Sequence, residues 1–196
     1  MTALTKKEKN RRLAESALML ALATILSKLA VFSLPFGGSV TLFSQVPIIL
    51  ISFRYGIKWG LKAGLAMSVL QLILGLDNFS YVSGIASLLT VALADYLVAF
   101  SALGLGGLFK NKIKNNVLAI SLGSALATLI RFICHFISGV TVWKEYAEGA
   151  PVVEYSLKYN GGYMLPELII TLVGVIVIAG IFDLNSLEIK TNFKKK

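Results

Sequence analysis

Charged residues are scarce in this chain of 196 amino acids: they make up 15% of it, against about 25% in an average soluble domain. Hydrophobic residues reach 56%, and the mean hydropathy is +0.77. The apolar residues fall in runs of roughly 18–25, the length of helix that crosses about 30 Å of hydrocarbon. The runs are continuous rather than alternating, so they favour transmembrane helices over a barrel.

Other absences narrow the function. The single cysteine, Cys134, excludes an internal disulfide and a cysteine metal cluster. The chain lacks a phosphate-binding loop of the G-x-x-x-x-G-K-[ST] type, so active transport would need a partner or an ion gradient as its energy source. We find no convincing internal repeat, which counts against an inverted-repeat transporter. The first apolar stretch has no cleavage site before Lys28 and is interpreted as a retained helix.

We therefore expect an all-α, polytopic membrane bundle of six transmembrane helices over residues 13–182, between basic tails at 1–12 and 183–196. A polar loop is expected over 142–160. The span that holds Pro47 is short, and a re-entrant segment is the alternative for it. The predicted spans cover about 13–33, 40–53, 58–76, 84–109, 115–141 and 161–182.

Basic residues orient this bundle. With both termini inside, 15 of the 19 Lys and Arg residues lie on the cytoplasmic side, and the outer loops keep only Lys144 and Lys158. This asymmetry predicts an N-in, C-in protein with an even number of spans. It also explains the net charge of +9 without a nucleic-acid partner.

Four ionisable residues fall inside the predicted spans, where a charge is costly and therefore marks a functional candidate. At 1.5 Å per residue, Asp95 lies roughly 16 Å below the outer surface, and Arg131, His135 and Glu167 lie within roughly 15 Å of it. Arg131 and His135 are four residues apart and share a helix face. The four residues predict a polar pocket open to the outside.

Aromatic residues surround this position. Tyr96 follows Asp95, Trp143 and Tyr155 lie near the outer ends of predicted helices, and Asn160 precedes the last one, where it can cap the helix or donate to a ligand. A carboxylate among aromatic rings suits a flat cationic ligand.

Structural roles remain alternatives for each of these residues. Asp95 and Arg131 could form an ion pair, and His135 could be a buried, satisfied imidazole. Glu167 could pair with Arg131 or Lys28. The Trp and Tyr residues could form an ordinary interfacial belt.

Small residues at a spacing of four allow helices to approach closely. The first predicted helix contains Ala17-x-x-x-Ala21, and the third contains Gly60-x-x-x-Gly64. Either pair can serve packing within the bundle or contact with a partner.

Four stretches together resemble a known family: PFGGSVTLFSQVPIILISFRYG at 35–56, ADYLVAFSALGLGGLF at 94–109, RFICHFISGVTVW at 131–143 and EYSLKYNGGYMLPE at 154–167. The chain resembles, over about residues 14–182, the thiamine-specific S components of energy-coupling factor (ECF) transporters, the ThiT/YuaJ family. At three positions it departs from that pattern. Gly38 and Leu42 stand where some members carry Trp and Glu, and Asp95 stands where some carry Glu.

The resemblance implies a bacterial cell-membrane protein that captures thiamine at its outer face and is not an enzyme. It implies a ligand site at Asp95, Tyr96, His135, Trp143, Tyr155 and Asn160, with no metal and no cofactor other than the bound thiamine. It also implies a lid over about 34–42 with Gly37 and Gly38 as hinges. Ala17 and Ala21 would contact an ECF transmembrane coupling subunit that works with two ATPase subunits.

Three other functions are weighed against this one. The same scaffold could bind another vitamin, although a neutral flavin would not explain Asp95. A solitary ion-coupled carrier would need no ATPase. An intramembrane enzyme using Asp95 and His135 as acid and base is disfavoured, because no nucleophile is evident beside them.

Overall fold

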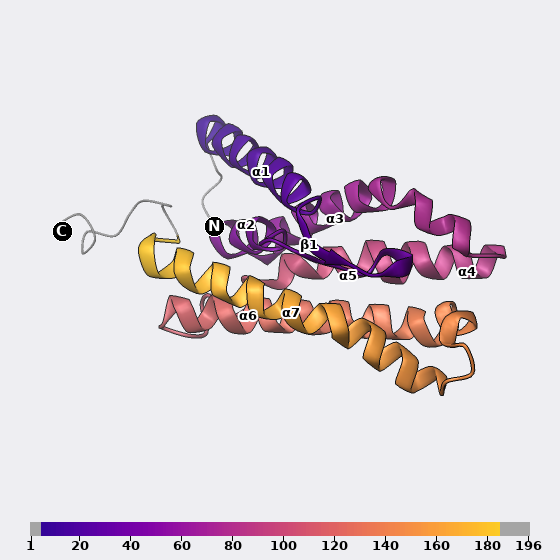
Figure 1. The fold of residues 1–196 in the computed structure, drawn as a ribbon. Coiled ribbons are helices and arrows are strands. Elements are labelled where there is room, and N and C mark those ends of the chain that lie inside the picture. The colour runs from indigo at the N-terminus through magenta and orange to yellow at the C-terminus, as the bar shows by residue number, and fades with distance from the viewer. Residues whose placement is uncertain (1–4, 185–196) are drawn as a thin grey trace.

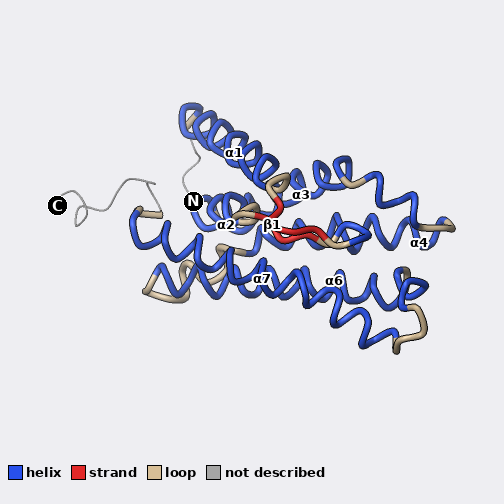
Figure 2. The backbone as a smooth tube through the Cα atoms, viewed as in Figure 1, coloured by secondary structure: helices blue, strands red, loops and turns tan. Residues whose placement is uncertain are grey.

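The computed structural model describes residues 5–184, which form a bundle of long helices lying side by side (Figure 1). A short hairpin interrupts the helices and is the red segment in Figure 2. Its strands are β1 (Ala30–Ser33) and β2 (Ser39–Thr41), joined by a 3-10 turn, Pro35–Gly37. The helices are α1 (Lys6–Leu26), α2 (Val46–Tyr55), α3 (Ile57–Leu74), α4 (Ile85–Thr90), α5 (Ala99–Ser101), α6 (Asn116–Thr141) and α7 (Val152–Ile181).

Several of these helices are long and apolar enough to cross a membrane. They are α3, α6, α7 and the continuous helical rod Ile85–Leu105, which includes α4 and α5. The other two of the six predicted spans correspond to helices that are shorter or more polar: α2 has 10 residues, and α1 begins in a basic segment. The start of α1 and the end of α7 lie at the same end of the bundle (Figure 1), as an even number of passes requires.

The first helix begins earlier and ends earlier than predicted. Thr5 and Glu8 form a capping box, so residues 6–12 of the predicted tail are helical. The helix ends at Leu26, and the apolar residues that follow build β1 instead of extending the span to residue 33. The boundaries predicted for this helix were therefore wrong. The basic cytoplasmic tail over 1–12 stays a prediction, and most of the predicted C-terminal tail lies outside the described residues.

The last helix corrects the predicted polar loop over 142–160, because α7 already begins at Val152. Polar residues in this part of the chain recur at helical spacing, at Ser156, Asn160, Tyr163 and Glu167, and all four are buried. They form one face of α7, which packs along α6. Low hydropathy here reflects a buried polar face and not a loop.

Glycines bring the helices together at the end of the bundle away from α4. An added Cβ at Gly104 would lie within 3.0 Å of the backbone of α3, and one at Gly123 within 3.0 Å of the backbone of Gly106. The Ser52 hydroxyl donates to the carbonyl of Gly104 and accepts from the amide of Gly107 at 2.9 Å. These close approaches make a tightly packed region around the fully buried α2 side chains Ile48, Ile49 and Phe53.

Candidate functional site

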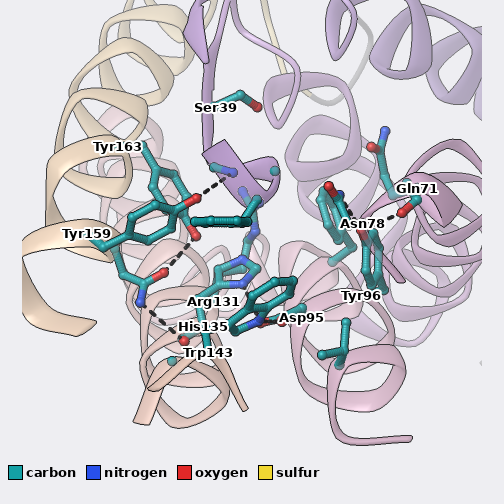
Figure 3. Close-up of a pocket in the computed structure, with 18 of the residues that line it drawn as sticks. Ser39, Gln71, Asn78, Asp95, Tyr96, Arg131, His135, Trp143, Tyr159 and Tyr163 are labelled. Atoms are coloured by element: carbon teal, nitrogen blue, oxygen red, sulfur yellow. Dashed lines mark hydrogen bonds and ion pairs between the residues drawn. The ribbon is translucent and has the colours of Figure 1, made fainter. Parts of the chain in front are cut away.

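A cavity of about 250 Å³ opens beside the hairpin, where α3, the rod Ile85–Leu105, α6 and α7 separate (Figure 3). This volume is close to the lower end of the range for small-molecule sites, about 300–1,000 Å³. All six residues predicted to bind ligand line it, as do Gly37 and Gly38. The residues predicted from the sequence come from four separate segments, and the structure places them around one cavity.

The Asp95 carboxylate makes hydrogen bonds with several side chains at the cavity. Its Oδ1 lies 2.9 Å from Nδ1 of His135, and its Oδ2 accepts from the Trp143 indole N–H at 3.1 Å. Ser138, one turn after His135, donates its hydroxyl to the same Oδ2 at 2.6 Å. The side chains of Asp95 and His135 are only 13% and 11% exposed, so the carboxylate is held in one orientation within a poorly solvated wall.

The two nitrogens of His135 have different surroundings. With Nδ1–H donating to Asp95, the neutral ring presents Nε2 as an acceptor. Nε2 is buried and has no hydrogen-bond partner among the described residues. A donor from a bound molecule would satisfy it.

Asp95 owes its position to an irregularity in the helix. Residues Val91–Val98 form a π-helical turn, a wider winding that occurs often at functional sites. Tyr96 follows on this turn and fixes the neighbouring connection, because its hydroxyl accepts from Asn78 at 3.0 Å and donates to the Gly75 carbonyl at 3.2 Å. The π turn thus directs the carboxylate to α6 and the phenol to the end of α3.

The α7 residues line the opposite wall. Tyr155 stacks on Tyr159 with ring centroids 5.9 Å apart. Asn160 does not precede the helix, as predicted, but lies inside it. Its amide nitrogen contacts the His135 carbonyl at 3.3 Å, and its amide oxygen accepts from Tyr163 at 3.0 Å. Asn160 therefore ties α7 to the backbone of the His135 turn.

The hairpin covers the cavity. Phe36, at its tip, packs its ring 4.2 Å from that of Tyr146 and 5.9 Å from that of Trp143. Gly37 has φ +97°, a backbone conformation that side chains rarely adopt, whereas Gly38 is extended and is crowded by Tyr159 and Tyr163. Only Gly37 has the unusual backbone expected at a hinge; Gly38 allows a close approach.

Arg131 and Glu167 do not form the ion pairs that the sequence left open. Asp95 pairs with His135, while the Arg131 guanidinium lies 4.4 Å from the centre of the Phe100 ring and is buried. Glu167 accepts hydrogen bonds from residues at the base of the hairpin: from the Thr41 amide at 2.6 Å and from the Gln45 amide group at 3.1 Å. Its role is to anchor this segment.

Sequence reasoning missed three residues that position the site without being ligand candidates: Ser138, Phe36 and Tyr159. Ser138 follows His135 by three positions on the same helix face, so the spacing could have identified it. Tyr159 follows Tyr155 by four positions, about one helical turn, so the spacing could have identified it as well. Phe36 gave no signal, because its place depends on a left-handed backbone with φ +63°.

Two further predictions concern surfaces and metals. Ala17 and Ala21 lie exposed on α1, whose one buried residue is Ala23. Their exposure leaves this face of α1 uncovered within the described chain. Within residues 5–184 no group of three or more His, Cys, Asp or Glu side chains is arranged to hold a metal ion.

Comparisons with known proteins identify the family of the chain. The family of thiamine transporter proteins (Thia_YuaJ) matches residues 13–185. The chain is 39% identical over 171 residues to the thiamine transporter ThiT of Bacillus subtilis, covering 81% of this chain and 85% of that protein. It is 31% identical over 144 residues to ThiT of Lacticaseibacillus paracasei, covering 68% and 69%.

The fold is also shared with a solved structure. ThiT from Listeria monocytogenes superposes with a TM-score of 0.72 at 21% identity, covering 88% of this chain and 94% of that one. This similarity supports the membrane helical bundle, and the sequence matches extend over most of the same residues. The chain belongs to the thiamine transporter (Thia_YuaJ) family, a family of non-enzymatic, multi-pass proteins of the bacterial cell membrane.

Proposed function

We propose that this chain captures thiamine in the cavity beside the hairpin and serves as the S component of an ECF uptake complex. The observation that carries the proposal is the carboxylate of Asp95, held by three hydrogen-bond donors in a wall of aromatic side chains. A fixed, poorly solvated negative charge attracts a cation strongly, and thiamine carries a cationic thiazolium ring. The family match supplies the identity of the vitamin.

The other cavity residues supply the remaining partners of such a ligand. Trp143 and Tyr155 offer ring faces to a flat heterocycle, and a cation over such a face gains further attraction. The free Nε2 of His135 accepts a hydrogen bond from an amino group, which thiamine carries on its pyrimidine. Asn160 and Tyr96 hold the helices that carry these groups.

Delivery into the cell is the second half of the proposal. The described chain contains no ATP-binding loop, so energy must come from elsewhere. The exposed Ala17 and Ala21 on α1 leave room for a partner helix to approach closely. We infer that a transmembrane coupling subunit with two ATPase subunits uses this face.

Thiamine titrated into the purified chain, followed by tryptophan fluorescence, tests the first half. Stacking on Trp143 should quench its emission with a dissociation constant in the nanomolar range, and replacing Trp143 with Phe should abolish the quench while Trp59→Phe should not. Absence of both quenching and calorimetric heat at micromolar thiamine would refute binding.

Competition and uptake measurements separate the alternatives. Riboflavin, pantothenate and biotin should fail to displace labelled thiamine; displacement by one of them at lower concentration would assign the site to that vitamin. Vesicles that contain only this chain should not accumulate thiamine, and addition of the coupling and ATPase subunits should restore uptake. Uptake by the chain alone would indicate an ion-coupled carrier.

A further inference from the structure

Helix α7 holds the hairpin at two separate points. Glu167 contacts the base of the hairpin, and Tyr159 contacts its tip. The two residues are eight positions apart, or roughly 12 Å along the helix. Because the tip covers the cavity and the base does not, the strength of each attachment decides which part of the hairpin can open.

The attachment at the base is extensive. Glu167 is 3% exposed and accepts from the amide and the hydroxyl of Thr41, at 2.6 and 2.8 Å. Ser44 and Gln45 add further hydrogen bonds to the same carboxylate. A buried carboxylate with this many donors is costly to expose, so residues 41–45 form a fixed pivot.

At the tip, one hydroxyl makes the hydrogen bonds that join residues 35–38 to another element of the described chain. The Tyr159 hydroxyl donates to the carbonyl of Pro35 and accepts from the amide of Gly38 at 3.1 Å. The tip has its own turn bond, from the Leu34 amide to the Gly38 carbonyl at 2.6 Å. Phe36 adds ring contacts, but its left-handed backbone is unfavourable for a bulky side chain.

We propose that Tyr159 is the latch of the hairpin: its hydroxyl keeps residues 35–38 closed over the cavity, and the hairpin opens by release of this hydroxyl about the pivot at Thr41. Tyr159 is thus a positioning residue that acts on the lid and not a ligand-binding residue. The assignment of this lid to thiamine exchange rests on the proposed function. The latch itself is a property of the chain without ligand.

The latch has a distinctive kinetic consequence. A gate that closes the empty and the loaded cavity alike must open for entry and for exit. Loss of the latch therefore accelerates association and dissociation together and leaves the dissociation constant nearly unchanged. A residue that contacts the ligand acts differently, because its loss accelerates dissociation alone.

Hydrogen–deuterium exchange of the ligand-free protein tests the latch without thiamine. In Tyr159→Phe the peptide covering residues 34–38 should exchange roughly three- to tenfold faster than in the wild type, as loss of one or two hydrogen bonds predicts. The peptide covering 41–45 should keep its rate. Equal rates at the tip, or a uniform acceleration of both peptides, would overturn the proposal.

Stopped-flow quenching by thiamine provides the second measurement. In Tyr159→Phe both rate constants should rise by a similar factor, roughly three- to tenfold. Faster dissociation with an unchanged association rate would make Tyr159 a ligand contact and would overturn the latch. Failure of thiamine to bind even the wild type would refute the proposed function while leaving the exchange result intact.

Tyr81→Phe is the matched control. The ring of Tyr81 lies 5.3 Å from that of Phe36, so this residue also packs on the tip, but its hydroxyl makes no hydrogen bond within the described part of the chain. The control should change neither the exchange of residues 34–38 nor the two rate constants. An effect equal to that of Tyr159→Phe would attribute the change to ring packing and not to the latch.

Discussion

The two ends of the bundle are packed in opposite ways. At one end, glycines on α3, the rod Ile85–Leu105 and α6 let backbones touch, and large α2 side chains fill the remaining space. At the other end the same helices separate around a cavity lined by polar and aromatic side chains. Close packing at one end therefore fixes the positions of the helices, and the same helices can hold a preformed site at the other end.

The largest expected effect is on the packed end. Gly123→Leu places a side chain against the backbone of Gly106 and should destabilise the fold by about 3 kcal/mol or more. Thermal unfolding in detergent measures the loss. Gly161→Ala is the control, since a Cβ there meets nothing within 4 Å; it should be neutral or slightly stabilising. Equal stability of the two variants would contradict the packing difference.

The next effect is on the cavity and concerns affinity more than stability. Asp95→Asn removes the charge while keeping the size, and should weaken thiamine binding by about 2 kcal/mol, roughly a 30-fold rise in Kd. Isothermal titration calorimetry is the measurement. Asp77→Asn changes an exposed carboxylate outside the cavity and should bind as the wild type does. An unchanged Kd for Asp95→Asn would remove the central electrostatic argument.

A smaller effect is expected at the junction between the two ends. Glu167→Gln replaces a carboxylate oxygen with a donor that faces the donors of Thr41 and Gln45. The unfolding free energy should fall by about 1.5 kcal/mol. Exchange at residues 41–45 should become faster than in the wild type, whereas Tyr159→Phe should leave it unchanged. An exchange rate at residues 41–45 that is as slow in Glu167→Gln as in the wild type would argue against the pivot.

The smallest effect on the isolated chain is expected at the exposed face of α1. Ala17→Leu should leave unfolding and thiamine binding within about 0.5 kcal/mol of the wild type, because the side chain is exposed. Uptake by the complete complex should nevertheless fall several-fold. Ala86→Leu, at another exposed alanine, on α4, should not reduce uptake. Equal uptake by both variants would remove α1 from the partner interface.

Much of the fold and the membership of the site followed from the sequence. Hydropathy located the central helices to within a few residues, since long apolar runs have few alternatives in lipid. The cost of charge in lipid selected Asp95 and His135, which lie together in the cavity. The same criterion does not predict which residue Asp95 contacts, because a contact with His135 or with Arg131 depends on how the helices are rotated about their axes.

The wrong helix boundaries lie where hydropathy does not follow secondary structure. The start of α7 was predicted as loop because Ser156 and Asn160 are polar, yet they face α6 at helical spacing. The end of the first span was predicted as helix because residues 29–32 are apolar, yet residues 30–33 form β1. In both places the direction in which a side chain points mattered more than its polarity. Hydropathy averaged along the chain does not record that direction.

The π turn at Val91–Val98 makes the acid's direction depend on residue count. Deleting one residue within the turn, such as Leu93, would allow regular winding at about 100° per residue, which changes the direction in which residues of the turn face while the flanking parts of the rod stay in register. Asp95 would then turn from His135 while its neighbours in sequence stayed the same. A change of length in this single turn, with no change of amino acid at the acid itself, is therefore enough to erase the site.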